Sequence, residues 1–473
     1  MNIAGVILAA GLSTRMKSSL PKVLHTMHGN PLLQYVINAL STLKPQRLVL
    51  VVGKHSEAIR ESIQKSGKIS FAEQREPKGT GHAVLQAVPS LLGFKGVVLI
   101  VNGDSPLVTP ETLKKFLNYH KKKRNDISVL SFTSQNPSSY GRILRDDRGR
   151  ILSVVEERDA TAEQKMIREV NSGVYAVGSH VLPLLKDIRL NPDKREYYLT
   201  DLVHIAREKG LREDACCIGN EEEFIGVNTR EELDRARVFM KDRMIRNFTR
   251  KGVNFVEAAS VFLSSDTDIG KETTLYPNVY LEGKTRIGRG CVIYPNVRIL
   301  NSVIEDEVVI KDSTLIEDSV VRKLASVGPF AHIRPGSVIG REARIGNFVE
   351  VKKSIVGSGT KASHLTYLGD ARIGKDVNIG AGTITCNYDG QKKHITKIED
   401  HVFIGSDSQL VAPVTIGKRA YVGAGSTITK DVPAEALAVS RIKQTNIEGW
   451  ARNRKLKVKS EKNKKQRKSA QGV

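Results

Sequence analysis

The sequence has little cysteine, few aromatic residues and no long apolar segment. Its 473 residues include four cysteines, one tryptophan and 5% aromatic residues. Cys216, Cys217, Cys291 and Cys386 have neither metal-ligand spacing nor the pattern of a secreted disulfide domain, which favours a reducing compartment. No apolar run reaches the roughly 18 to 20 residues of a spanning helix. The apolar stretch 3–10 lacks a basic region before it, so we expect no signal peptide, no membrane insertion and a cytoplasmic location.

Positive charge, by contrast, is abundant and uneven. The formal net charge is +23, and residues 452–468 hold ten Lys or Arg against one acid, Glu461. Such an excess suits anionic partners such as nucleotides, phosphates, coenzyme A or nucleic acid. The body has no aromatic-basic interleaving typical of RNA-binding modules, so nucleic acid is the least favoured of these partners. We expect the tail, residues 451–473, to be a solvated, disordered extension.

The first 228 residues alternate strand-like and helix-like segments. Residues 3–10, 47–52 and 96–101 predict buried strands, and residues 31–43 and 80–92 predict helices. This alternation is typical of an α/β, Rossmann-like parallel sheet with helices on both faces. Ligands of such sheets bind at the carboxyl ends of the strands.

From residue 260 onward, apolar residues recur every six positions, for example at Ile287, Ile293 and Ile299. A sustained hexapeptide period predicts a parallel β-helix. The period is interrupted at residues 352–368 and 386–397, and insertions in repeat proteins usually serve a binding face. We therefore divide the chain into an α/β domain (1–228), a long linking helix (229–250), a β-helix domain (251–450) and the tail (451–473).

The loop from Leu8 to Arg15, followed by Pro21-Lys22, comes directly after a predicted strand. Small residues let backbone N–H groups approach phosphates, and Arg15 and Lys22 could neutralise charge on a transferring phosphoryl group. The loop is not a Walker A motif, and the alternative is a turn with two surface cations. Asp104 ends another predicted strand, where a carboxylate could bind a divalent cation or simply belong to a turn.

His364 marks the second candidate site, in the first interruption of the repeat. A histidine there could act as the general base that an amine needs before it attacks a thioester. Arg334, Lys352 and Arg441 could hold phosphates, and the small residues Ser406 and Ala424 leave room for a pantetheine arm. The alternative is an ordinary surface histidine.

The N-terminal motifs resemble the sugar-1-phosphate nucleotidyltransferase family, which has a Gly-rich loop, a downstream Pro-Lys and a Gly-Asp metal site. Ser13 stands where that family usually has Gly. Over residues 1–450 the chain resembles the bifunctional family that joins such a domain to a left-handed β-helix acetyltransferase. The specific motifs are residues 333–336, 364–370, 378–388 and 405–407.

The resemblance implies two consecutive reactions. Glucosamine-1-phosphate is acetylated by acetyl-CoA, and UMP then passes from UTP to N-acetylglucosamine-1-phosphate with release of pyrophosphate. The product, UDP-N-acetylglucosamine, serves peptidoglycan and lipid A synthesis. The resemblance also implies Mg²⁺ as cofactor and a homotrimer. The alternative function is a single-activity sugar-1-phosphate nucleotidyltransferase whose β-helix is only structural.

The resemblance also assigns residues to each site. For the uridylyltransferase it implies Arg15 and Lys22 as catalytic cations and Asp104 and Asn228 as the metal ligands. UTP and UDP-N-acetylglucosamine would contact Leu8, Ala9, Ala10, Gly11, Lys22, Gln74, Gly79, Thr80, Asn102, Gly103, Asp104, Gly141, Glu156, Asn171 and Asn228. For the acetyltransferase it implies His364 as the base. Glucosamine-1-phosphate would contact Arg334, Lys352, Tyr367, Asn378, Asn387 and Tyr388, and acetyl-CoA would contact Ala381, Ser406, Ala424 and Arg441.

Overall fold

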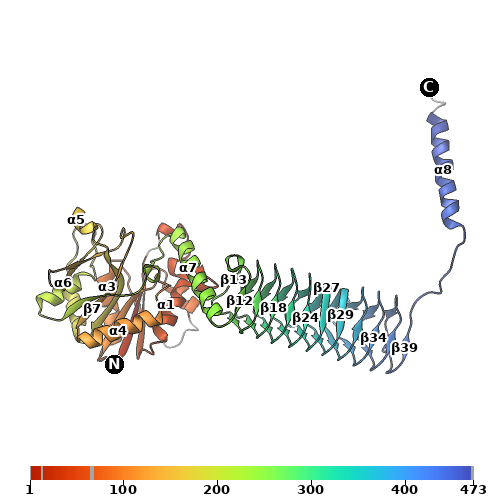
Figure 1. Ribbon diagram of the computed structural model, residues 1–473, viewed down its shortest axis with the longest axis horizontal. Helices are drawn as coiled ribbons and strands as arrows, with labels where there is room; N and C mark the ends of the chain where they lie inside the picture. Colours follow the sequence, from red (N-terminus) through yellow and green to blue (C-terminus); the bar gives the residue numbers. More distant parts are fainter. Residues whose placement is uncertain (1, 12–13, 64–68, 470–473) are drawn as a thin grey trace. The chain divides into compact units, whose positions relative to one another are not determined.

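The computed structural model describes residues 2–11, 14–63 and 69–469, and Figure 1 shows the chain. It divides into two compact units, Met1–Ser302 and Val303–Val473. This division falls inside the repeat region, so the domain boundaries drawn from the sequence remain predictions. Within the described ranges, no helix combines the length and apolarity needed to cross a membrane. Ser13, the departure in the Gly-rich loop, lies outside the described residues.

The first unit is built on a sheet of nine described strands. Seven of them follow the order β11-β7-β10-β6-β1-β4-β5, β8 pairs with β10, and β9 pairs with β8. The strands are β1 (Ile3–Ala9), β4 (Arg47–Val52), β5 (Ser70–Glu73), β6 (Val97–Asn102), β7 (Ile127–Thr133), β8 (Arg142–Arg145), β9 (Ile151–Val155), β10 (Glu169–Gly178) and β11 (Glu213–Cys217), and a small pair is formed by β2 (Thr26–Met27) and β3 (Asn30–Pro31). The three predicted strands are confirmed. The sheet is mixed, because β10 runs antiparallel to both β6 and β7.

Side chains of the central strands alternate between two apolar cores, one on each face of the sheet. Val6 and Ile100 face one core with α3 and α6, whereas Ile7 and Leu99 face the other with α1, α2 and α4. Strands buried on both faces need continuous apolar runs, which is what the sequence shows. The helices are α1 (Leu32–Ser41), α2 (Ser56–Ile63), α3 (Thr80–Ala87), α4 (Pro110–Lys123), α5 (Ala162–Lys165) and α6 (Asp201–Glu208).

A long helix, α7 (Arg230–Arg250), follows the sheet where the sequence predicts one. Thr229 and Glu232 form a capping box, which satisfies two backbone N–H groups of the first turn. Leu233 and Met240 are buried in a core shared with Met16. The start of α7 is thereby fixed against the α/β sheet, directly after Asn228.

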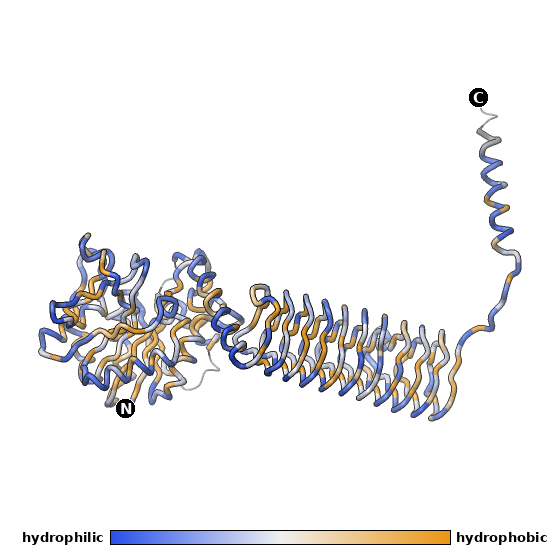
Figure 2. Tube along the Cα trace, in the orientation of Figure 1, coloured by the Kyte–Doolittle hydropathy of each residue, from blue (hydrophilic) through white to orange (hydrophobic). Residues whose placement is uncertain are grey.

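Short parallel strands then repeat in both units, and Figure 2 shows apolar positions recurring from coil to coil. Typical register partners are 18 residues apart, as in Leu263 with Leu281 and Val321 with Ile339, and their side chains are buried. The predicted parallel β-helix is confirmed. In the first unit the strands are β12 (Asn254–Phe255), β13 (Phe262–Leu263), β14 (Asp268–Ile269), β15 (Thr274–Leu275), β16 (Tyr280–Glu282), β17 (Arg286–Ile287), β18 (Val292–Ile293) and β19 (Arg298–Leu300).

The second unit continues with the strands that hold the second candidate site. They are β20 (Val303–Ile304), β21 (Val309–Ile310), β22 (Leu315–Glu317), β23 (Val320–Val321), β24 (Ser326–Val327), β25 (His332–Ile333), β26 (Val338–Ile339), β27 (Arg344–Lys352), β28 (Ile355–Val356), β29 (Lys361–Gly369), β30 (Ala371–Ile373), β31 (Asn378–Ile379), β32 (Ile384–Cys386), β33 (Thr396–Ile398), β34 (Phe403–Ile404), β35 (Gln409–Val411), β36 (Val414–Ile416), β37 (Tyr421–Val422), β38 (Thr427–Ile428) and β39 (Leu437–Ala438).

The two interruptions of the repeat have different structures. In the first, β27 and β29 pair in register from Arg344 with Lys361 to Lys352 with Gly369, so the coil has 17 residues, as do other coils of the second unit. No loop is inserted there, and His364 lies on a strand, which corrects the expectation of a polar loop. The second is a true insertion, because Ile373 pairs with Ile398 across a hairpin.

The last described element is α8 (Trp450–Ser469), and its side chains up to residue 465 are exposed. That exposure fits a solvated extension, and the disorder expected from the sequence remains a prediction. Lys, Arg and Gln are good helix formers, and no Pro or Gly interrupts residues 450–469.

Candidate active sites

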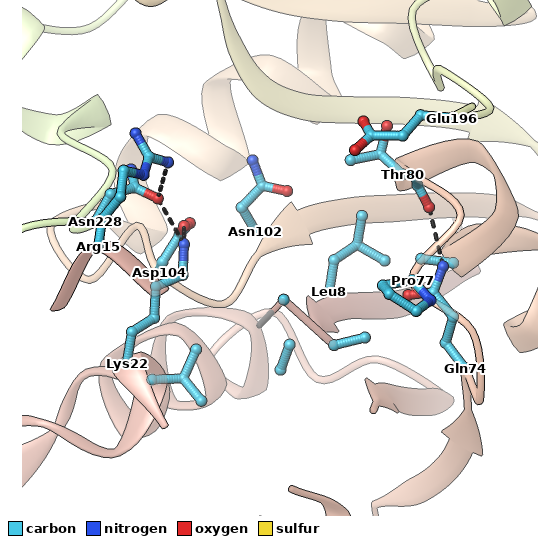
Figure 3. A pocket seen from close by; sticks show the side chains of 16 residues that line it. Leu8, Arg15, Lys22, Gln74, Pro77, Thr80, Asn102, Asp104, Glu196 and Asn228 are labelled. Carbon is cyan, nitrogen blue, oxygen red and sulfur yellow. Dashed lines mark hydrogen bonds and ion pairs between the residues drawn. The ribbon is translucent and has the colours of Figure 1, made fainter. Parts of the chain in front are cut away.

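A cleft of about 540 Å³ opens at the carboxyl ends of β1 and β6 (Figure 3). It brings together most of the residues predicted for the nucleotide site: Leu8, Ala9, Ala10, Gly11, Arg15, Lys22, Gln74, Gly79, Thr80, Asn102, Asp104 and Asn228. Val23, Pro77, Ala83 and Glu196 also line it and were not predicted. Gly103 acts through its backbone, because its N–H donates to the Leu8 carbonyl at 2.8 Å and a Cβ would lie 3.0 Å from that oxygen.

Two oxygens in this cleft converge on one cation. The Lys22 ammonium forms an ion pair with Asp104 and donates to Asn228 Oδ1 at 2.7 Å. Arg15 Nη2 donates to the same Asn228 oxygen at 3.0 Å. Carboxylate and amide oxygens that already share an ammonium group are close enough to share a divalent cation, and hard cations prefer such ligands. The side chains of Lys22 and Asp104 are only 15% and 17% exposed, which strengthens their electrostatic coupling.

A second cavity, of about 240 Å³, shares Leu8, Thr80, Asn102, Asp104 and Asn228 with the cleft and extends it toward β10. The predicted sugar-contacting residues Gly141, Glu156 and Asn171 line this extension. Burial raises the pKa of Glu156, and Thr200 donates a hydrogen bond to its carboxyl group at 3.4 Å. Tyr140, Tyr175 and Thr200 were not predicted but also line the cavity.

The predicted base, His364, lies exposed on β29 beside Asn347 of β27. Asn347 Oδ1 is 2.6 Å from His364 Nδ1. A carbonyl oxygen can only accept a hydrogen bond, so His364 Nδ1 carries the proton and Nε2 has a free lone pair. Asn347 thereby selects the tautomer in which His364 can take a proton from a substrate. Asn347 was not predicted from the sequence.

Three cations, Arg334, Lys352 and Lys393, lie near one another in the second unit. Arg334 forms an ion pair with Glu350 at 2.6 Å. Glu350 pairs in register with Tyr367, which was also predicted to contact glucosamine-1-phosphate. Lys393, on the hairpin, lies within hydrogen-bonding range of Lys352 and lowers the pKa of that ammonium group by repulsion between like charges. A bound phosphate would relieve this repulsion.

The hairpin that carries Lys393 also contributes an amide and a phenol. Asn387 Nδ2 donates to the Asp370 carboxylate at 2.5 Å, and the Tyr388 hydroxyl donates to the Gly390 carbonyl at 2.6 Å. Asn378 is half-buried on β31, the strand that pairs with the start of β29.

The four predicted acetyl-CoA residues follow one another on successive coils. The Asp407 N–H donates to the Ala381 carbonyl, next to Ser406, and the Gly425 N–H donates to the Ser406 carbonyl. Arg441 Nη1 then donates to the Ala424 carbonyl at 2.9 Å. Ala381, Ser406, Ala424 and Arg441 thus form one stack along the β-helix.

Three further residues of the second unit were missed together with Asn347: Glu350, Asp370 and Lys393. Asn347 and Asp370 each lie 17 residues from a predicted residue, His364 and Asn387 respectively. Glu350 lies 16 residues from Arg334. The coil period was therefore the signal that could have found them.

The fold and the two sites define a nucleotidyltransferase joined to a hexapeptide-repeat transferase. Residues 5–173 match the MobA-like NTP transferase domain, residues 258–354 the GMPPB C-terminal domain, and residues 395–430 the bacterial transferase hexapeptide with six repeats. The chain belongs to the bifunctional GlmU family. It is 52% identical over 450 residues to the bifunctional protein GlmU of Thermodesulfovibrio yellowstonii, covering 95% of this chain and 99% of that one.

A second relative, the bifunctional protein GlmU of Pelobacter propionicus, is 46% identical over 97% of this chain and 100% of its own length. A solved UDP-glucose pyrophosphorylase complexed with UDP-glucose is 19% identical with a TM-score of 0.43, covering 51% of this chain and 100% of that one. The GlmU relatives extend across both halves, which supports a two-activity enzyme and not the single-activity alternative. A nucleotidyltransferase of this family calls for a divalent metal ion, which the oxygens of Asp104 and Asn228 fit.

Proposed function

We propose that this enzyme makes UDP-N-acetylglucosamine by acetylating glucosamine-1-phosphate in the second unit and transferring UMP to the acetylated product in the first. The observation that supports this most is that each residue set gathers within its own unit. Lys22, Asp104 and Asn228 meet in the first unit, and Asn347 and His364 meet in the second. Each set has the chemistry that its reaction requires.

In the uridylyltransferase site, the backbone of Leu8–Gly11 approaches the UTP phosphates, and Gln74, Gly79 and Thr80 surround the base. The sugar part enters the extension lined by Gly141, Glu156 and Asn171. The phosphate oxygen of N-acetylglucosamine-1-phosphate attacks the α-phosphorus of UTP, and the bond to pyrophosphate breaks. Arg15 and Lys22 stabilise the negative charge on the transferring group.

Mg²⁺ is the proposed metal, held by Asp104 and Asn228 together with substrate phosphates. When bound it neutralises phosphate charge and orients the phosphates. The Lys22 ammonium contacts the same two oxygens, so the position is suited to positive charge.

In the acetyltransferase site, Arg334 and Lys352 hold the phosphate of glucosamine-1-phosphate, and Tyr367, Asn378, Asn387 and Tyr388 contact the sugar. His364 Nε2 takes a proton from the sugar ammonium group, and the free amine attacks the thioester carbonyl of acetyl-CoA. The carbon–sulfur bond breaks, and coenzyme A leaves as the thiolate that accepts a proton. The stack of Ala381, Ser406, Ala424 and Arg441 binds the pantetheine arm of acetyl-CoA.

We further propose that the enzyme acts as a homotrimer and works in the cytoplasm. The trimer follows from the family resemblance. The location is supported by the substrates, since UTP and acetyl-CoA are made inside the cell.

Two reciprocal variants test the proposal. His364→Ala should abolish CoA release from acetyl-CoA and glucosamine-1-phosphate and leave pyrophosphate release from UTP and N-acetylglucosamine-1-phosphate intact. Arg15→Ala should do the opposite. Both side chains are exposed, so neither substitution should disturb the core. If His364→Ala retains acetyl transfer, His364 is not the base. If the unmodified protein releases no CoA, the second activity is absent.

A further inference from the structure

Gln74, at the proposed uracil end of the cleft, is held by contacts that fix which end of its amide faces the nucleotide. Its side chain is 5% exposed, and its backbone N–H donates to Val52 of the neighbouring strand at 2.8 Å. Gln74 Nε2 donates to the Gly79 carbonyl at 3.0 Å, as Figure 3 shows. The same nitrogen lies 3.0 Å from His82 Nδ1.

These contacts determine the orientation of the amide. A backbone carbonyl can only accept a hydrogen bond, so the NH₂ group of Gln74 must face Gly79. Its second hydrogen then points to His82 Nδ1, which must be the unprotonated nitrogen of a neutral ring. His82 Nε2 therefore carries the proton and lies 3.1 Å from Gln86 Nε2. A half-turn of the Gln86 amide gives up its long, 3.5 Å contact with the His82 carbonyl and presents its oxygen to that proton. Gln74 Oε1 is left as an acceptor.

We propose that His82 is a positioning residue for base selection: it holds Gln74 with its carbonyl oxygen toward the nucleotide, so that the site accepts uracil and rejects cytosine. The inference rests on the proposed function, which places the base beside Gln74. Uracil presents an N3–H donor to such an acceptor, whereas cytosine has an unprotonated N3 that would repel it. A site built to satisfy a donor rejects the analogue that lacks it.

The surroundings of His82 keep its ring neutral and in place. The ring stacks on Tyr197 with centroids 6.2 Å apart. Burial holds the pKa of His82 below its ordinary value, Lys78 lowers it further and Glu76 opposes this. His82 also lines a cavity of about 340 Å³ with Lys78 and Lys186, through which solvent protons can reach it.

Protonation of His82 should weaken base selection. The imidazolium has donors on both nitrogens, so its Nδ1–H would oppose the NH₂ group of Gln74. The amide would then lose one of its two orienting contacts. The preference for UTP over CTP should fall as the pH drops through the pKa of His82.

The experiment compares two substitutions in the full-length enzyme. His82→Phe keeps a ring against Tyr197 but removes the acceptor. His82→Asn keeps an acceptor near the position of Nδ1. For each we measure kcat/KM for UTP and CTP by pyrophosphate release with N-acetylglucosamine-1-phosphate, from about pH 8 to about pH 5.5. Thermal unfolding of each variant checks that it is folded.

We expect the UTP-to-CTP ratio to fall about tenfold in His82→Phe and to stay within about threefold of the unmodified enzyme in His82→Asn. The ratio should fall toward acidic pH in the unmodified enzyme and remain constant in His82→Asn. Equal losses for UTP and CTP, with an unchanged ratio at every pH, would overturn the role of His82 and leave the proposed function intact. Absence of UMP transfer in the unmodified enzyme would overturn the proposed function itself. If His82→Phe does not fold, the pH dependence of the UTP-to-CTP ratio in the unmodified enzyme and in His82→Asn tests the role of His82.

Discussion

Removal of the Asn347 amide should slow acetyl transfer without affecting uridylyl transfer. Asn347 Oδ1 lies 2.6 Å from His364 Nδ1, so it accepts the ring proton. When His364 takes the substrate proton, this contact becomes a hydrogen bond from a cation. Such bonds contribute about 1.5 to 3 kcal/mol, which corresponds to roughly 10- to 150-fold in rate.

The lower part of that range applies here, because His364 is exposed and water screens its charge. We therefore expect Asn347→Ala to reduce kcat for CoA release by about 10- to 30-fold. The KM for glucosamine-1-phosphate should stay nearly constant, since Asn347 does not belong to the cation cluster around Arg334 and Lys352. Asn347→Asp retains an oxygen acceptor and should keep activity within about threefold.

The assay is steady-state CoA release, with pyrophosphate release measured on the same preparation as a control for folding. A kcat within twofold of the unmodified enzyme in Asn347→Ala, together with an inactive His364→Ala, would refute the argument that Asn347 selects the tautomer. Equal losses in Asn347→Ala and Asn347→Asp would refute it as well.

Three further predictions follow from the geometry. Chelation by EDTA should stop pyrophosphate release and leave CoA release unchanged, because the proposed metal ligands lie beside Lys22 in the first unit; loss of both activities would contradict this assignment. Gly346→Ala would place a Cβ 1.9 Å from the Ser363 carbonyl oxygen, so β27 and β29 must separate next to Asn347. A misplacement of catalytic groups by about 1 Å can reduce the rate about 100-fold, so the rate of CoA release should fall by about that factor. A normal rate would contradict the inference that close packing of β27 on β29 positions Asn347 and His364. Burial raises the pKa of Glu156, so its ionisation destabilises the folded state as the pH rises above the unfolded value of about 4.3. Glu156→Gln should therefore raise the thermal unfolding midpoint at about pH 7 but not at about pH 4, as scanning fluorimetry can show, and an equal effect at both values would exclude the burial mechanism.

Much of the fold could be predicted because its strongest signals are local. The apolar runs of β1, β4 and β6 are continuous, since each strand is buried on both faces. The six-residue period follows from one buried side chain per short strand. The direction of β10 could not be predicted in the same way, because strand direction depends on pairing partners far along the chain.

The first interruption of the repeat shows a second reason why a prediction from sequence can be wrong. A coil that is one residue short and a coil with an inserted loop both shift the phase of the apolar pattern. The register of β27 with β29, for example of Ile345 with Ala362, shows that the coil was shortened. The sequence therefore identified His364 as a candidate residue but predicted a loop where the structure has a strand.

The two candidate sites differ in how sequence relates to geometry. In the first unit, Lys22, Asp104 and Asn228 are distant in sequence and meet because the ends of parallel strands and the start of α7 converge. Their mutual contact required the fold. In the second unit, neighbours across coils are separated by one coil length, as Asn347 and His364 are by 17 residues. Once the period is known, the neighbours of any β-helix residue can be read by adding or subtracting one coil. That rule identifies Asn347 and Asp370, but not Lys393, because the hairpin interrupts the count.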